Sequence, residues 1–274
     1  KDQLFKHKMD AIVAEVELLR PRTKGSFRLS KAFHQSYSNY HNIFSNHLES
    51  YKESLAEYEL FNTHPQFKEE EPQNFKICLA NLISRSHSAG KVNELLRYID
   101  ELKSLPSSTL NEDGEVFQNV YFLEHLHYIN SGEFEKAEAL VSDIEKGLDI
   151  YSYKINKARY LSFLYNIMVM YFLMHKFKEA SNWAYRILDD KSNIKKDVSL
   201  VTRMLLPIIH FELGHFDIVE NLTRSAYRFL KKKDRLHSFE KLMVKYLKSM
   251  PFSQDSAEFM TKLEDFSSSL ASMY

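Results

Sequence analysis

Histidine is the residue type in this chain with the clearest capacity for chemistry, because twelve histidines occur in 274 residues. Neutral imidazoles bind transition metals and exchange protons near neutral pH. His125 and His127 are two residues apart, a spacing that directs them to different sides of a helix. His210 and His215 lack the spacing that places two imidazoles one helical turn apart on the same helix. The pattern therefore favours structural or surface histidines. Of the three functional hypotheses considered below, a metal-dependent enzyme ranks last.

The single cysteine, Cys78, is the only candidate thiol nucleophile. It lies in an apolar helical stretch, and pairing with His87 as a base would need a contact that one helix cannot provide. Asp189 and Asp190 stand at a helix end in a polar loop, where solvation explains them. No GxSxG or Walker-type pattern occurs. We therefore predict a protein that is not an enzyme, with no catalytic residues, no metal and no cofactor.

The charge pattern argues against nucleic acid and membrane partners. Lysine plus arginine and aspartate plus glutamate both number 37, so no net charge attracts a polyanion. The apolar stretch at residues 160–174 is too short to cross a bilayer, so we expect no membrane insertion. A basic cluster near a predicted helix C-terminus is favoured by the helix dipole, and the alternative is a contact with phosphate or an acidic partner. Its members are Arg224, Arg228, Lys231, Lys232, Lys233 and Arg235.

Composition and periodicity predict a folded, all-α protein. Hydrophobic residues make up 44% of the chain, and six Gly and six Pro are too few for an all-β fold with many turns. A lone cysteine that forms no internal disulfide is typical of a reducing compartment, so we expect a cytoplasmic location. An amphipathic helix is predicted at the start by a stripe of Phe5, Met9, Ile12, Val16 and Leu19.

Five short strings of one shape recur along the chain, at about 40-residue intervals, which is the signature of stacked repeats. They are LESYKES (48–54), AGKVNEL (89–95), SGEFEKA (131–137), MHKFKEA (174–180) and LGHFDIV (213–219). Their first common positions are Glu49, Gly90, Gly132, His175 and Gly214. A bulky residue mostly follows two positions later, and five positions after the common residue come Ser54, Leu95, Ala137, Ala180 and Val219.

This pattern resembles the tetratricopeptide repeat (TPR), whose helix pairs carry a glycine in the turn, then an aromatic residue and a small residue at the close helix contact. Pro65 and Pro106 agree with the family's proline at the end of the second helix. The repeat length exceeds the family's usual 34, and the small residue expected inside the first helix is replaced by Asn42, Ile83, His125, Met168 and Pro207. The resemblance implies a TPR-like, right-handed α-solenoid of antiparallel helix pairs.

The expected organisation is one domain over residues 1–274. Residues 1–29 form a leading helix and linker, residues 30–230 form about five helix-pair repeats, and residues 236–274 form capping helices. In the last part, residues 238–250 and 255–270 read as two helices separated by Pro251. Such an atypical terminal unit shields the end of a repeat stack.

The resemblance also implies a ligand groove along first-helix positions 2, 5, 9 and 12. These positions are apolar and aromatic here and lack the Lys and Asn pattern that grips a terminal carboxylate. Such a lining suits an amphipathic helix or an extended apolar segment. Filling of the groove by the protein itself is equally open. The occupant would then be the leading helix, through Phe5, Ile12 and Val16, or a second copy of the chain in a homodimer. The expected groove residues are Asn119, Phe122, Leu126, Tyr165, Val169, Phe172, Met204, Ile208 and Phe211.

The sequence thus predicts a non-catalytic scaffold that binds a protein or peptide. The alternative is a peptide-sensing domain that controls an attached DNA-binding module, as similar repeat domains do in bacterial transcription regulators. That alternative would need a helix-turn-helix region before Lys1. Because the chain does not open with Met, we expect it to be a fragment whose natural N-terminus lies further upstream.

Overall fold

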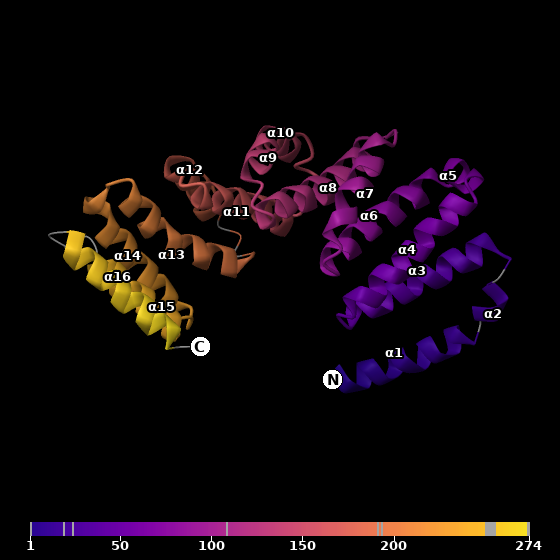
Figure 1. The fold of residues 1–274 in the computed structure, drawn as a ribbon, viewed down its shortest axis with the longest axis horizontal. Coiled ribbons are helices and arrows are strands. Elements are labelled where there is room, and N and C mark those ends of the chain that lie inside the picture. Colours follow the sequence, from indigo (N-terminus) through magenta and orange to yellow (C-terminus); the bar gives the residue numbers. More distant parts are fainter. Residues whose placement is uncertain are drawn as a thin grey trace. The chain divides into compact units, whose positions relative to one another are not determined.

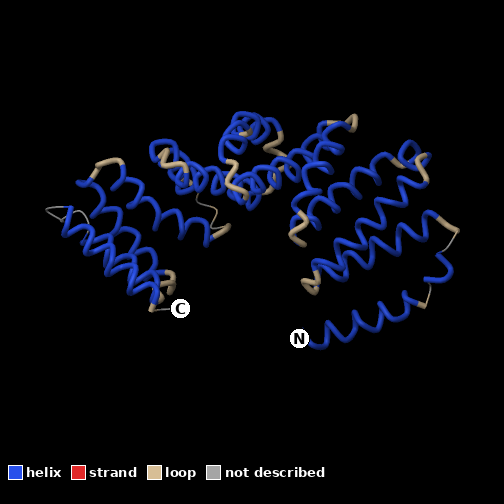
Figure 2. Tube along the Cα trace, in the orientation of Figure 1, coloured by secondary structure: helices blue, strands red, loops and turns tan. Residues whose placement is uncertain are grey.

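The computed structural model describes residues 2–18, 20–23, 25–107, 109–190, 192, 194–249 and 256–272. Every regular element among these residues is a helix, which confirms the all-α prediction (Figure 2). The chain divides into two compact units, unit 1 (Lys1–Ser131) and unit 2 (Gly132–Tyr274), which are described separately. None of the described helices is both long enough and apolar enough to span a bilayer.

Unit 1 is a succession of helices that pack on their neighbours in chain order (Figure 1). Helix α3 packs on α4, α4 on α6, and α6 on α7, while α8 contacts both α6 and α7. The core between them is apolar and aromatic, with Phe61, Leu79 and Ile99 completely buried. The helices are α1 (Asp2–Glu17), α2 (Arg20–Thr23), α3 (Phe27–Ile43), α4 (His47–Thr63), α5 (Gln66–Glu70), α6 (Pro72–Ser88), α7 (Val92–Ser104) and α8 (Leu110–Asn130).

Helix α1 is the predicted leading helix, and it packs beside α3. Two α3 phenols hold it: Tyr37 Oη donates to Val13 O at 3.1 Å, and Tyr40 Oη donates to Asp10 Oδ1 at 2.5 Å. Ile12, one of the stripe residues, is 53% exposed. The α1 contact therefore depends in part on tyrosine hydrogen bonds, and the side chain of Phe5 lies outside the described residues.

Unit 2 follows the same plan. Helix α11 packs on α12, α12 on α13, α13 on α14, α14 on α15 and α15 on α16. The last two helices confirm the two helices predicted near the C-terminus. The helices are α9 (Phe134–Ala139), α10 (Val141–Ile150), α11 (Lys157–Leu173), α12 (Phe177–Leu188), α13 (Lys196–Glu212), α14 (Phe216–Lys232), α15 (Ser238–Ser249) and α16 (Ser256–Ala271).

Four of the five recurring strings begin at a helix C-cap that is followed by a left-handed residue. At one of them, His175 N donates to Phe172 O at 3.1 Å and Lys176 N donates to Tyr171 O at 2.9 Å. This pair of bonds is the Schellman motif, in which glycine is favoured because a positive φ costs it little. The left-handed residues of the five turns are Ser45, Gly90, Gly132, His175 and Gly214.

The first repeat is therefore aligned incorrectly by the sequence. Its left-handed residue is Ser45, four positions before the expected Glu49, and Glu49 lies inside α4. A search for glycine misses this turn because its left-handed residue is a serine. The string LESYKES resembles the pattern but does not lie at the turn. With Ser45 as the reference, the residue five positions later is Ser50 in place of Ser54. The residues then found at this position are all 0% exposed: Ser50, Leu95, Ala137, Ala180 and Val219.

Candidate functional site in the groove between α6 and α8

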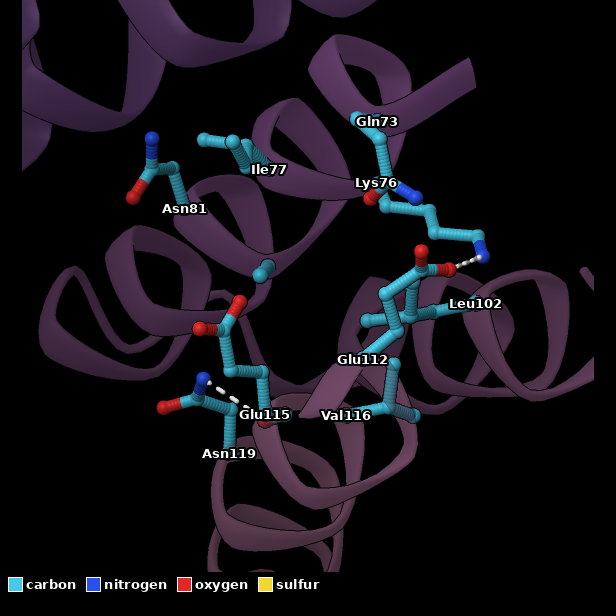
Figure 3. Close-up of a pocket in the computed structure, with 10 residues that line it drawn as sticks. Gln73, Lys76, Ile77, Asn81, Leu102, Glu112, Glu115, Val116 and Asn119 are labelled. Carbon is cyan, nitrogen blue, oxygen red and sulfur yellow. Dashed lines mark hydrogen bonds and ion pairs between the residues drawn. The ribbon is translucent and has the colours of Figure 1, made fainter. Parts of the chain in front are cut away.

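A pocket of about 170 Å³ lies in unit 1 between the facing sides of α6 and α8 (Figure 3). Gln73, Ile77 and Asn81 are spaced by four residues, so they form one stripe along α6. The stripe is about 12 Å long, since a helix rises 1.5 Å per residue. The lining residues are Gln73, Lys76, Ile77, Ala80 and Asn81 of α6, Leu102 of α7, and Glu112, Glu115, Val116 and Asn119 of α8.

One end of the pocket is fixed by a buried ion pair. Lys76 is only 7% exposed, and its Nζ lies 2.8 Å from Glu112 Oε2 and donates to Pro106 O at 2.5 Å. Glu112 belongs to the first turn of α8, and its backbone N–H donates to the N-cap residue Thr109 at 3.3 Å. A buried ammonium needs such partners, because an unpaired one would be very costly. The pair therefore ties α6 to the start of α8 at this end of the pocket.

The other end of the pocket carries amide side chains, and the lining also has an apolar part, which we call the floor. In Figure 3, Asn81, Glu115 and Asn119 lie together at the end opposite Lys76 and Glu112. Asn119 Nδ2 donates to Glu115 O at 2.9 Å. Leu102, Val116 and Ala80 form the apolar part, and Ile77 is 46% exposed at its edge.

This lining suits binding better than catalysis. An amide side chain both donates and accepts hydrogen bonds, which matches a peptide backbone, and Lys76 and Glu112 already neutralise each other. Among the residues that the structure describes, no three His, Cys, Asp or Glu side chains are grouped to hold a metal ion. The pocket therefore offers hydrogen bonds and an apolar contact.

The predicted groove residues of α8 are in part at this pocket. Asn119 lines it, while Phe122 and Leu126 lie half-buried further along α8. The sequence prediction carried the groove positions onto the last three repeats only. The same four positions in the second repeat are Ile77, Ala80, Ser84 and His87. The first two line the pocket and the last two do not, so the repeat pattern could have found part of the lining.

In unit 2, α11 and α13 carry the other predicted groove residues. Tyr165, Val169 and Phe172 are half-buried on α11, and the Phe172 ring meets Phe177 edge-on at 5.8 Å. Met204 of α13 is 6% exposed and packs in a core cluster with Leu230 and Val244. The Met204 side chain is thus part of the core of unit 2.

Ile208 and Phe211 of α13 line a second, apolar pocket of about 260 Å³. Its other walls come from the two terminal helices, with Tyr246 and Leu247 of α15 and Leu263 and Phe266 of α16. The helices predicted as a cap therefore cover the predicted groove face of α13 themselves. The expected alternative, filling by the leading helix, is not seen at the α6/α8 pocket, because none of the described side chains of α1 lines it.

His210 and His215, set aside by the sequence, are brought together by the turn at Gly214. His215 N donates to His210 O at 2.9 Å, and the two Nδ1 atoms lie 3.1 Å apart. His210 Nε2 lies 2.9 Å from Tyr185 Oη. The spacing rule applies to a single continuous helix, whereas α13 ends at Glu212 and the following turn brings the two rings together. Burial lowers the pKa of His210, and the neighbouring His215 lowers it further.

Two other candidate residues for chemistry lie in the core of unit 1. Cys78 is 0% exposed, and burial raises the pKa of its thiol, so it is an unreactive core residue. His125 is also 0% exposed, and burial lowers its pKa to about 4. Neither side chain lines the α6/α8 pocket.

The chain matches no protein-family model, and no curated protein matches it. The likeness to the tetratricopeptide repeat therefore stays a prediction from its turns and helix pairs.

Proposed function

We propose that this chain is a non-catalytic, TPR-like scaffold of right-handed stacked helix pairs that binds a protein or peptide. The groove between α6 and α8 is its contact surface in unit 1. The observation that carries the proposal is the pocket itself: two facing helical stripes present amide side chains around an apolar floor. The buried free thiol of Cys78 is in keeping with a cytoplasmic setting.

The size and chemistry of the groove favour an extended peptide segment. An extended chain advances about 3.3 Å per residue, so a stripe of about 12 Å accommodates three or four residues. The amides of Gln73, Asn81 and Asn119 can pair with backbone groups of any sequence. Ile77 and the floor beneath it then select an apolar side chain. Affinity would come from the backbone bonds and specificity from the floor.

A charge placed at the exposed edge of the floor tests this proposal. In Ile77→Arg the side chain is already 46% exposed, so folding should be retained while apolar contact with the partner is lost. Leu48→Arg is the matched control, because Leu48 is 48% exposed on α4 and does not line the pocket. We expect tagged wild type and Leu48→Arg to recover the same partner protein, and Ile77→Arg to recover about tenfold less. Equal recovery with folded Ile77→Arg would remove this groove from the proposal.

A further inference from the structure

A second polar pocket, of about 280 Å³, lies in unit 2 beside the start of α13, and residues of α11, α12 and the last part of α14 also line it. One part of its lining is apolar and includes Leu161, Ile187, Val198 and Phe229. The other part is cationic, with Lys195, Lys196 and Arg203. A site that joins an apolar wall to converging cations is suited to a small molecule with an apolar body and an anionic head.

Arg203 has unused hydrogen-bonding capacity at this pocket. Its guanidinium carbon lies 4.5 Å from the centroid of the Phe229 ring, which also attracts Lys233 Nζ at 6.0 Å. The Nε of Arg203 is buried and has no hydrogen-bond partner among the described residues. A buried donor without an acceptor is unfavourable, and a small rotation that brings the guanidinium to an oxyanion in the pocket would supply the missing acceptor.

The charge around Arg203 is not balanced by protein groups. Asp190 is the only carboxylate in the described lining, and it already accepts from Ser192 Oγ at 2.7 Å and lies 3.4 Å from Lys157 Nζ. Burial would raise the pKa of Asp190, but these partners outweigh burial and lower it. Lys195 and Lys196 make no ion pair with any residue that the structure describes. The pocket therefore keeps an excess of positive charge.

We propose that this pocket binds a small amphipathic organic anion. Its phosphate or carboxylate head would accept from the Arg203 guanidinium and neutralise Lys195 and Lys196, while its apolar body would pack on Phe229 and Val198. The site belongs to unit 2 and uses none of the residues of the α6/α8 groove, so it stands independently of the peptide-binding proposal.

Titration calorimetry on the full chain, at constant ionic strength, tests the proposal with three probes. Phenyl phosphate has both parts of the inferred ligand, inorganic phosphate has only the head, and phenol has only the body. We expect phenyl phosphate to bind with one-to-one stoichiometry and at least about tenfold more tightly than either part, since the two contacts add. Failure of phenyl phosphate to bind, or binding no tighter than that of inorganic phosphate, would overturn the inference.

Two arginines that both lie over aromatic rings provide a matched pair of variants. Arg203→Gln removes the unpartnered donor and should weaken phenyl phosphate binding about tenfold. Arg186 lies 4.0 Å from the Trp183 ring but already pairs with Glu145 at 2.7 Å, so Arg186→Gln should bind as wild type does. Equal affinity in wild type and Arg203→Gln contradicts the proposal.

A third variant covers the case in which Arg203→Gln fails to fold. Lys195 is exposed and has a φ of 55°, a conformation that asparagine tolerates well. Lys195→Asn therefore removes one cation without disturbing the start of α13. We expect phenyl phosphate to bind this variant several-fold more weakly, most clearly at low salt, and unchanged affinity would count against the site.

Discussion

Unit 1 and unit 2 both consist of helices that pack on their neighbours along the chain, but the two units differ in what they bury. Unit 1 encloses Glu57, Lys76, Glu124 and His125 at 7% exposure or less. Among the described residues of unit 2, the buried polar side chains are Ser181, Thr202, Thr223 and His210. The same architecture therefore tolerates an ionisable core in one unit and an almost uncharged one in the other. What differs physically is how each unit should respond to pH.

Two buried groups of unit 1 titrate with opposite effects on stability. Burial raises the pKa of Glu57 from 4.5 to about 7, although Lys31 and His34 oppose the shift. A raised carboxyl pKa stabilises the fold below pH 4.5, and this contribution is lost as the pH rises through 7. Burial lowers the pKa of His125 from 6.5 to about 4, so its contribution is present above pH 6.5 and lost as the pH falls through 4. The two effects largely offset each other in the wild type.

Removing either group should reveal the pH dependence of stability that the other group causes, and this is the largest effect we expect. Each shift corresponds to about 3 kcal/mol. In Glu57→Gln, unit 1 should lose about that much stability as the pH falls from 6.5 to 4. In His125→Leu, it should lose about as much as the pH rises from 4.5 to 7. Hydrogen exchange of α4 and α8 amides across this pH range measures both.

The single tryptophan, Trp183, gives a control inside the same molecule. It is 6% exposed in α12, so its fluorescence reports only on unit 2. Urea unfolding followed at Trp183 should show the same pH dependence in Glu57→Gln, His125→Leu and wild type. Parallel pH profiles of unit 1 exchange in all three proteins would mean that the two buried groups do not titrate as described.

Overpacking at the close helix contacts should cost less, and unequally in the two units. Ala180 is 0% exposed in α12, so Ala180→Leu should destabilise unit 2 by about 1 to 3 kcal/mol. At the equivalent position of unit 1, Ser50 Oγ donates to Ser38 O at 2.8 Å, so Ser50→Leu also loses a buried hydrogen bond and should cost more. Urea unfolding followed at Trp183 measures the first variant, and hydrogen exchange of α3 and α4 measures the second. Ala139→Leu, at an exposed position of α9, is the control and should change little.

The turns should give the smallest effects. His175 has a φ of 57°, a conformation that costs glycine less than histidine. His175→Gly should therefore stabilise unit 2, by about 0.5 kcal/mol once the lost contact between the His175 and Phe177 rings is subtracted. Gly214→Ala should destabilise it by about 1 kcal/mol. No atom lies within 4 Å of the Cβ that would be added at Gly214, so backbone strain alone is tested. Urea unfolding followed at Trp183 should show that His175→Gly is more stable and Gly214→Ala less stable than the wild type. A change in stability of the same sign in both variants would contradict the explanation by backbone strain at the left-handed residues.

The helices and most turns were predictable from sequence because periodicity and glycine position are local signals. The stripe from Met9 to Val16 predicts α1, and Gly90 and Gly214 mark true C-caps. The first turn was missed because the left-handed residue is Ser45. Glycine preference is a tendency that a compatible backbone can override.

The site was less predictable because its groups are distant in sequence. Lys76 and Glu112 are 36 residues apart, and each looks like an ordinary surface charge until packing buries the lysine. The covering of Ile208 and Phe211 by α15 and α16 likewise depends on how the terminal helices fold back. Periodicity shows which residues share one face of a helix, but it does not show what packs against that face.

Photo-cross-linking from the groove tests the central proposal most directly. A benzophenone amino acid placed at Ile77, Leu48 or Phe172 reports which surface lies against the captured partner. We expect cross-links to the partner from position 77 and none from position 48, which has a similar exposure outside the groove. Cross-links from position 172 would add the predicted groove face of unit 2 to the contact. Cross-links from position 48 or 172 without any from position 77 would contradict binding between α6 and α8.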